Sequence, residues 1–321
     1  MKKSSRAAVL VGFLVPLGIL ACININGTTL AGASKTVGRS PAQQLRRMLQ
    51  MAPMAAYTRL HLEVTSQAQF DEISDEALNA VEQMIQGHYD ASIATLEALE
   101  TKSPGNYSTA SNLGTAYELK GDNRKALQWI SEGIKRNPES HEGTEWLHEL
   151  ILQAKLKMEK EPDWLKNHHI LDADETQIAA SDYRLRASDR SLSLKEIQTA
   201  LRHQLTERML FVKPKDPIVA DLLHTYAMVE AHATVMESAI ELMTLSKEYG
   251  VSDPMLIDSQ LADFERALKR ATLLREVLFY AISIGVVGAF VGGLYYCHRR
   301  KWFFLSIKDY RAYQAAHAEK R

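Results

Sequence analysis

A 34-residue period is the feature of this sequence that most restricts its fold. Gly87 and Gly121 are 34 residues apart, and Pro104 and Pro138 have the same separation. Alignment on these four positions divides residues 73–140 into two equal repeats. A unit of this length holds two short helices, and it buries its apolar face only when a neighbouring unit stacks on it. The period therefore predicts an all-α stack of helical hairpins.

The small residues and turn residues of the second repeat agree with a hairpin. Gly114 and Ala126 are small enough to let two helices approach closely. Gly121 can adopt a positive φ and end the first helix, and Asp122 can cap the second. Pro138 prevents the second helix from continuing. These residues predict two helices with a turn between them.

The repeat at 107–140 resembles a tetratricopeptide repeat, and the repeat at 73–106 keeps part of the pattern, although Ala110 replaces the usual tryptophan. The sequence HEGTEWLHELILQAKL at 141–156 is similar to an extension of exported bacterial proteins of this superfamily. The resemblance implies a solenoid of helical pairs that binds other proteins. The positions that carry it are Gly87, Tyr89, Pro104, Leu113, Gly114, Tyr117, Gly121, Ala126 and Pro138.

The resemblance also implies a concave face lined by the first helix of each pair. The lysine and asparagine pairs of the carboxylate-clamp subfamily are missing there, so we expect a mildly apolar groove for a peptide. The alternative is that these residues face solvent or a neighbouring helix. The groove positions are Ser74, Ala77, Val81, Met84, Ile85, Ser108, Ser111, Thr115, Glu118 and Leu119.

Other helices are expected on both sides of the repeats. Ser40-Pro41 begins one, Ser140 caps the helix that closes the stack, and Ser193 with Glu196 forms a capping box. Two later patterns, 216–231 and 233–248, form a degenerate helical pair. The predicted divisions are 1–33 signal sequence or signal anchor, 34–72 N-terminal helical segment, 73–158 repeats with a capping helix, 159–192 linker, 193–252 degenerate pair, 253–297 juxtamembrane and transmembrane helix, and 298–321 basic tail.

The N-terminus has the pattern of an export signal. Basic residues precede an apolar run from Ala7 to Ala21, which is short for a membrane span. We expect cleavage after Ala33 or retention of an uncleaved signal, and the alternative is lipidation at Cys22. Because the chain holds only Cys22 and Cys297, both in apolar segments, the part between them has no disulfide framework.

The C-terminal apolar segment predicts a membrane span. Residues 277–297 carry no formal charge and form a helix of roughly 30 Å, which matches the bilayer core. The basic run at 298–301 follows directly, and basic flanks stay in the cytoplasm. We therefore expect a bacterial inner-membrane protein with a periplasmic helical domain and a cytoplasmic tail. Small residues in the span would allow homodimer packing, namely Gly285, Gly288, Ala289, Gly292 and Gly293.

Two histidine clusters are candidate metal sites. On one continuous helix, His141, Glu145 and His148 would share a face, but a solvated polar face is the expectation. Adjacent His168 and His169 should point apart, so a structural or solvent role is expected there too. The second cluster also includes Asp172, Asp174 and Glu175.

The expected function is binding. Both ends are basic and the middle is acidic, which argues against nucleic-acid binding. No dinucleotide, phosphate-loop, kinase or hydrolase motif is present, so no enzyme activity and no cofactor are expected. The leading hypothesis is a membrane-anchored scaffold or assembly factor with a protein or peptide partner. The alternatives are a transmembrane signalling component that acts through the short tail and, below it, a metal-dependent enzyme.

Overall fold

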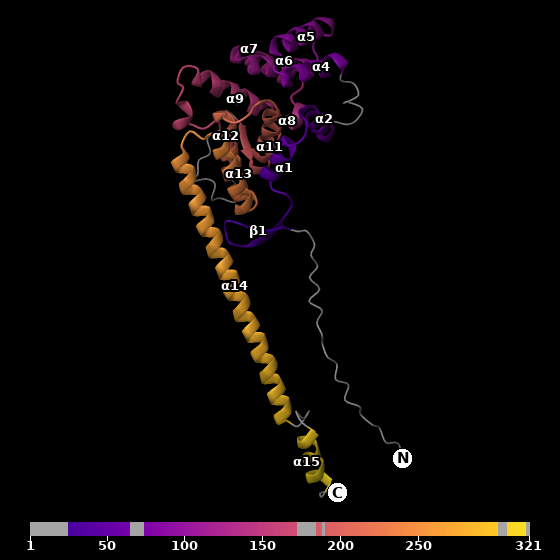
Figure 1. Cartoon of the computed structure of the whole chain (residues 1–321), viewed down its shortest axis with the longest axis vertical. Helices are drawn as coiled ribbons and strands as arrows, with labels where there is room; N and C mark the ends of the chain where they lie inside the picture. Colours follow the sequence, from indigo (N-terminus) through magenta and orange to yellow (C-terminus); the bar gives the residue numbers. More distant parts are fainter. Residues whose placement is uncertain (1–24, 65–73, 172–183, 188–189, 301–306, 319–321) are drawn as a thin grey trace, which may run out of the picture.

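The computed structural model describes residues 25–64, 74–171, 184–187, 190–300 and 307–318 (Figure 1). These residues form thirteen α-helices and two short β-hairpins. The fold is all-α, with stacked helical hairpins, further helices and a long C-terminal helix, as predicted from the sequence.

The two repeats form two helical hairpins. The first consists of α4 (Asp75–Ile85) and α5 (Tyr89–Lys102), and the second consists of α6 (Tyr107–Lys120) and α7 (Asn123–Arg136). Helix α5 packs against both α4 and α6, and α7 packs against α6. The hairpins therefore stack consecutively, in the order that the period predicts.

Local residue chemistry explains the second hairpin. Gly121 has a φ of 95° and ends α6, and the Asp122 carboxylate accepts a hydrogen bond from the Lys125 N–H at 3.1 Å. A Cβ atom at Gly114 would lie 2.5 Å from Cδ1 of Ile130 in α7. Glycine is therefore required there for α6 and α7 to approach as closely as they do.

The chain after the second hairpin differs from the prediction. Ser140 does not cap a long helix, because α8 (Ser140–Gly143) is a single turn in which His141 and Glu142 have φ values of 51° and 59°. Gly143 also has a positive φ of 68°. Three successive left-handed residues redirect the chain, and α9 (Glu145–Met158) begins only after them. The assumed continuous helix from His141 to His148 is therefore wrong.

A second group of helices follows. The 3₁₀ turn η1 (Trp164–Lys166) and the strand β3 (Arg184–Ala187) lie in the predicted linker, and β4 (Arg190–Ser193) extends one residue beyond it. Helix α11 (Leu194–Phe211) begins with the predicted Ser193 capping box. Helices α12 (Pro217–Ala233) and α13 (Met236–Tyr249) pack against each other close to the predicted pair.

The folded body begins earlier than the predicted signal boundary at residue 33. Strands β1 (Ile25–Thr28) and β2 (Ser34–Val37) form an antiparallel hairpin across that boundary. The buried Thr28 donates its backbone N–H to the Glu237 carboxylate of α13 at 2.7 Å. Cleavage after Ala33 would remove β1 from this contact. The remainder of the predicted signal lies outside the described residues.

Two apolar cores share one helix. The first joins α11, α12 and α13 with α9 and with α1 (Pro41–Leu49). The second fills the stacked hairpins and includes Ala56 and Tyr57 of α2 (Pro53–Val64). Helix α11 supplies Leu201 to the first core and Leu210 to the second. It therefore holds the hairpin stack against the rest of the body.

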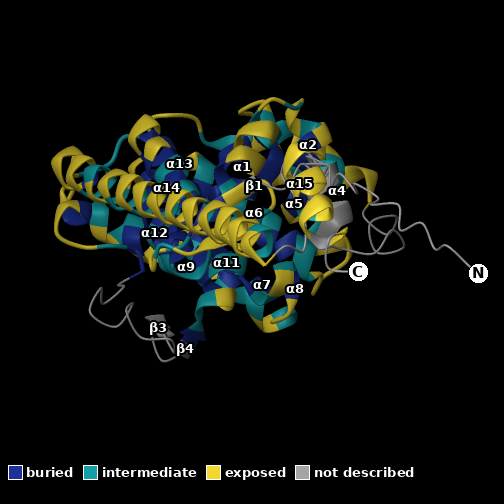
Figure 2. Ribbon diagram, turned by 90° about the horizontal axis from the view of Figure 1, so that it is seen from below, coloured by how far each residue is buried: buried dark blue, intermediate teal, exposed yellow. Residues whose placement is uncertain are grey.

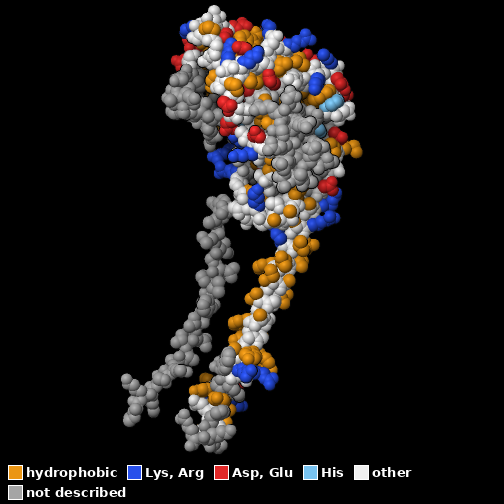
Figure 3. Space-filling model, turned by 180° about the vertical axis from the view of Figure 1, so that it is seen from behind, with side chains coloured by type: hydrophobic (Ala, Val, Ile, Leu, Met, Phe, Trp, Pro, Cys, Tyr) orange, Lys and Arg blue, Asp and Glu red, His pale blue; other side chains and the backbone are white. Residues whose placement is uncertain are grey.

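The longest helix, α14 (Pro254–Arg299), leaves this body as a rod (Figure 1), and most of it is exposed (Figure 2). Its 46 residues extend over about 69 Å at 1.5 Å per residue. Ile257 is buried beside α13, whereas the apolar stretch farther along is exposed on all sides. Hydrophobic side chains follow that stretch, and Lys and Arg lie at its far end (Figure 3). It is long and apolar enough to cross a membrane. A further helix, α15 (Ile307–Ala318), follows.

Candidate functional site

The predicted concave groove is covered by the chain itself. Val81 and Met84 of α4 are almost fully buried. They belong to the same core as Tyr57 of α2 and Leu210 of α11, and α4 contacts both of those helices. The alternative interpretation, that these positions face a neighbouring helix, describes the structure better than an open groove.

The other groove positions differ in exposure. Ser111 and Glu118 are also buried, and Ser74 is exposed because it caps the N-terminus of α4. A peptide could reach Val81 and Met84 only if α2 and α11 moved, because both helices contact α4 and share its core. The partly buried positions are Ala77, Ile85, Ser108, Thr115 and Leu119.

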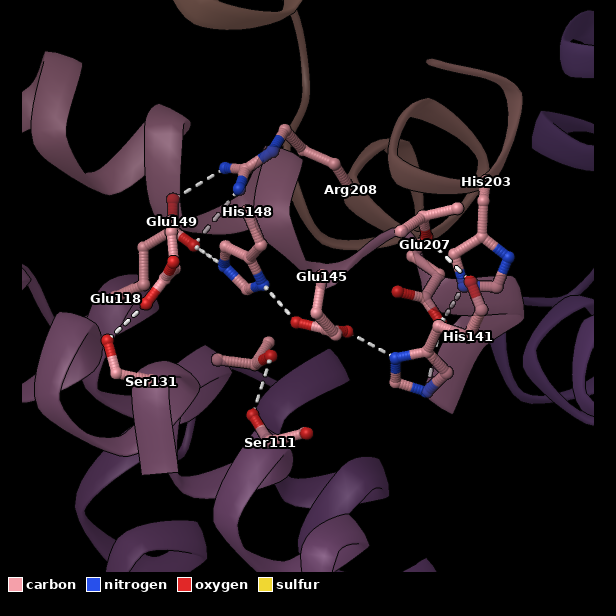
Figure 4. A network of polar contacts seen from close by, with 12 residues as sticks. Ser111, Glu118, Ser131, His141, Glu145, His148, Glu149, His203, Glu207 and Arg208 are labelled. Atoms are coloured by element: carbon pink, nitrogen blue, oxygen red, sulfur yellow. Dashed lines mark hydrogen bonds and ion pairs between the residues drawn. The ribbon is translucent and has the colours of Figure 1, made fainter. Parts of the chain in front are cut away.

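Glu118 of α6 is the centre of a buried ionic network (Figure 4). The Arg208 guanidinium of α11 donates to it at 2.5 and 3.1 Å. The Lys155 ammonium lies 2.6 Å from it, and the His148 Nε2 lies 2.7 Å from it. Burial alone raises the pKa of Glu118, but the Arg208 and Lys155 charges outweigh burial and hold it well below the usual range. The carboxylate is therefore ionised, and it joins α6, α9 and α11.

The network continues through α9 to α8. Glu145 lies between His148, whose Nδ1 is 3.5 Å away, and His141, which contacts its other oxygen. Burial by itself lowers the pKa of each histidine. The carboxylates of Glu118 and Glu145 raise the pKa of His148 to about 9, and those of Glu207 and Glu145 raise that of His141 to about 9. Burial raises the pKa of Glu145, but the two histidines outweigh it and lower the pKa to about 2.

Two residues of α11 complete this cluster, and sequence reasoning missed both. The His203 ring stacks on His141 with 5.1 Å between ring centroids, and its Nε2 lies 3.3 Å from Oε1 of Glu207. The His141 Nε2 lies 3.9 Å from the same Glu207 oxygen. The sequence pattern that could have indicated them is the i, i+4 spacing of His203 and Glu207, which places both side chains on one helix face. Their approach to His141 depends on long-range packing.

The second predicted histidine cluster separates. His168 stacks on Trp164 with ring centroids 4.7 Å apart. His169 turns to α12, where its Nδ1 lies 2.5 Å from the Asp221 carboxylate. The two adjacent histidines thus have different partners, as expected. The three acidic residues assigned to this cluster, Asp172, Asp174 and Glu175, lie outside the described residues.

An open pocket lies beside the buried network, between the end of α7, the start of α9 and the start of α11. Its volume is about 490 Å³, which is within the usual range of roughly 300–1,000 Å³ for ligand pockets. We call it the α7–α11 pocket. Its lining consists of Ile134, Pro138, Glu139, Glu142, Gly143, Thr144, Glu145, Trp146, Leu192, Ser193, Lys195, Glu196 and Thr199.

The remaining predicted residues are the repeat signature residues and the small residues of α14. Among the repeat signature residues, Leu113, Gly114, Tyr117 and Ala126 are buried, Gly87 has a positive φ, Tyr89 begins α5, and the exposed Pro104 and Pro138 follow α5 and α7. The small residues of the span, Gly285, Gly288, Ala289, Gly292 and Gly293, all lie on the exposed part of α14. Dimer packing through them stays a prediction.

No family model matches this chain, and no curated protein matches it.

Proposed function

We propose that this chain is a membrane-anchored binding protein of tetratricopeptide-repeat type, and that it binds a segment of another protein in the α7–α11 pocket. The observation that carries the proposal is the pocket itself. It lies where the second hairpin ends, it is open, and Trp146 and Leu192 give it apolar surface. One or two large side chains of a partner fit its volume of about 490 Å³.

The charge of the α7–α11 pocket indicates the chemistry of the partner. Glu139, Glu142 and Glu196 place exposed carboxylates around it, against one ammonium group from Lys195. Glu142 also accepts a hydrogen bond from Arg202 at 2.7 Å. We propose a partner segment with a large apolar side chain next to basic residues, because such a segment complements both the apolar surface and the acidic rim.

Helix α14 supports a proposal for the location of the protein. Its exposed apolar stretch supports a single membrane span near the C-terminus, and the basic run at 298–301 supports a cytoplasmic tail. We propose that the helical body faces the periplasm at a bacterial inner membrane. The rigid connection through α14 then keeps the pocket at a fixed distance from the bilayer, as a scaffold or assembly factor requires.

Photo-crosslinking in intact cells tests the binding proposal. A photoreactive amino acid replaces Glu139 or Lys195 at the pocket, and the exposed Asn79 of α4 serves as the matched control. We expect the same crosslinked protein from both pocket positions and none of it from position 79. Identical products from all three positions, or a product at position 79 alone, would contradict the proposed binding site.

A further inference from the structure

Three side chains of metal-ligand type meet where α8 lies against α11. His141 comes from α8, and His203 and Glu207 lie one turn apart on α11. Their nearest nitrogen and oxygen atoms lie within 4.8 Å of one another. We propose that His141, His203 and Glu207 bind a divalent transition-metal ion. Two imidazoles and one carboxylate are a donor set that zinc sites use, so Zn²⁺ is the ion to test first.

The distances fit a single ion. Tetrahedral zinc with bonds of roughly 2.0–2.1 Å holds neighbouring ligand atoms roughly 3.3 Å apart. The His203 Nε2 and Glu207 Oε1 are 3.3 Å apart, and the His141 Nε2 is 3.9 Å from the same oxygen. All three ligand atoms lie within 4.8 Å of one another, so binding requires the His141 side chain to move closer to the other two.

The buried His203 gives independent support. Its side chain is only 1% exposed, and neither ring nitrogen has a hydrogen-bond partner. Most buried polar groups form a hydrogen bond, because burial removes the water that would otherwise bind them. The Nε2 lies 3.3 Å from the Glu207 carboxylate without forming a hydrogen bond to it, and a metal ion bound between the two atoms would join them.

Glu145 is in position to orient one ligand. Its carboxylate contacts Nδ1 of His141, which directs the opposite nitrogen, Nε2, toward Glu207. Metal-binding histidines commonly have such a carboxylate on the other ring nitrogen, since it fixes the tautomer and the ring orientation. The left-handed backbone of α8 presents the His141 ring to both Glu145 and α11.

The proposed ion would link the end of the repeat stack to α11. It does not depend on binding in the α7–α11 pocket, because none of the three proposed ligands lines that pocket. The side chains of His141 and Glu207 are 18% and 22% exposed, so the site can exchange an ion with solvent. Three protein ligands leave one position for water.

Metal titration of the full chain tests the site. The protein, purified in detergent without a histidine tag, is stripped with a chelator, dialysed against Zn²⁺ and measured for metal content. We expect one zinc per chain and a higher Tm with zinc than without it. Replacing Zn²⁺ with Co²⁺ should give the visible absorption of a tetrahedral complex. Wild-type protein that retains no stoichiometric ion overturns the proposal.

Variants locate the ion. Glu207→Gln preserves side-chain volume and should abolish both the bound zinc and the Tm increase, and Glu145→Gln should weaken binding by about 10–100-fold. His169→Gln, at the other histidine–carboxylate contact, is the matched control and should keep one zinc. If Glu207→Gln does not fold, His141→Asn replaces it, because asparagine tolerates the left-handed backbone of α8. Zinc retained in the ligand variant, or lost in His169→Gln, would place the ion elsewhere.

Discussion

At the scale of single residues, the buried charge of Glu118 needs compensating charges around it. Its carboxylate is surrounded by Arg208, Lys155 and His148. Removing one partner of a buried ion pair leaves the others without compensation, at a cost of about 3–5 kcal/mol. We therefore expect Glu118→Ala to lower the free energy of unfolding by that amount. Denaturant unfolding followed by circular dichroism measures it.

The matched control for that measurement is Glu161→Ala, since Glu161 is exposed. Its effect should stay within about 0.5 kcal/mol. Equal effects of the two substitutions would show that the network around Glu118 adds no stability.

His148 should make stability depend on pH. The Glu118 and Glu145 carboxylates hold its pKa at about 9 in the folded chain, against about 6.5 in the unfolded chain. A raised folded pKa contributes stability that is complete below pH 6.5 and is lost as the pH rises through 9. We therefore compare the free energy of unfolding of wild-type protein and of His148→Gln, both in chelator. Between pH 6.5 and 9 the wild-type value should fall by about 3 kcal/mol more than the value of the variant.

Charges from three helices surround that imidazole, namely Glu118 of α6, Glu145 and Lys155 of α9, and Arg208 of α11. His141, whose pKa is also about 9, contributes its own pH dependence. The comparison therefore uses the difference between wild type and variant. Parallel stability curves from pH 6.5 to 9 would contradict the assignment.

Residues whose role is local could be predicted from the sequence. Gly121, Asp122 and the Ser193–Glu196 box act within one turn of chain, and each has its predicted role. His203 was missed because its role depends on the packing of α11 against α8, about 60 positions earlier in the chain. Burial of Glu118 was missed for the same reason.

At the scale of elements, the close approach of α6 and α7 should be sensitive to one added methyl group. The Cβ of Gly114→Ala would lie 2.5 Å from Cδ1 of Ile130, and overpacking of this kind costs about 1–3 kcal/mol. Ile130→Ala removes both that Cδ1 atom and the Cγ1 atom, which would lie 2.6 Å from the added methyl group. We expect the double variant to be more stable than the sum of the two single-variant destabilisations predicts. A double-mutant cycle measured by thermal unfolding tests this.

The N-terminal hairpin leads to a prediction about processing. Strand β1 pairs with β2 and contacts α13, so the mature chain should retain Ile25. Mass spectrometry of the protein purified from membranes should find an N-terminus at or before residue 25. An N-terminus at Ser34 would show that the hairpin is absent from the mature protein.

Element predictions succeeded where the pattern was periodic. The helices at 217–233 and 236–249 lie within a few residues of their predicted bounds. The hairpin at 25–37 was missed because it follows an export-signal pattern directly and resembles its cleavage region. The open groove was wrong for a different reason. The repeat pattern specifies which face of α4 and α6 is concave, but it carries no information about α2 and α11, which pack on buried positions of that face.

At the scale of the whole molecule, α11 and α14 have different structural roles. Helix α11 contributes to both cores and to the ionic network, so it fixes the repeat stack to the α12–α13 pair. Helix α14 packs on α13 and then continues into the apolar stretch. Because the connection is one uninterrupted helix, a change in the tilt of the apolar stretch would move the whole body.

The membrane orientation can be tested with single cysteines. The described body before the span contains no cysteine, so Asn79→Cys on α4 and Ala315→Cys on α15 report on opposite ends once Cys22 and Cys297 are replaced by serine. Both chosen positions are exposed. Because basic flanks stay in the cytoplasm, a membrane-impermeant maleimide should label position 79 in intact spheroplasts and position 315 only after lysis. Labelling in the reverse order would place the body in the cytoplasm, and labelling of both positions in intact spheroplasts would rule out a single span between them.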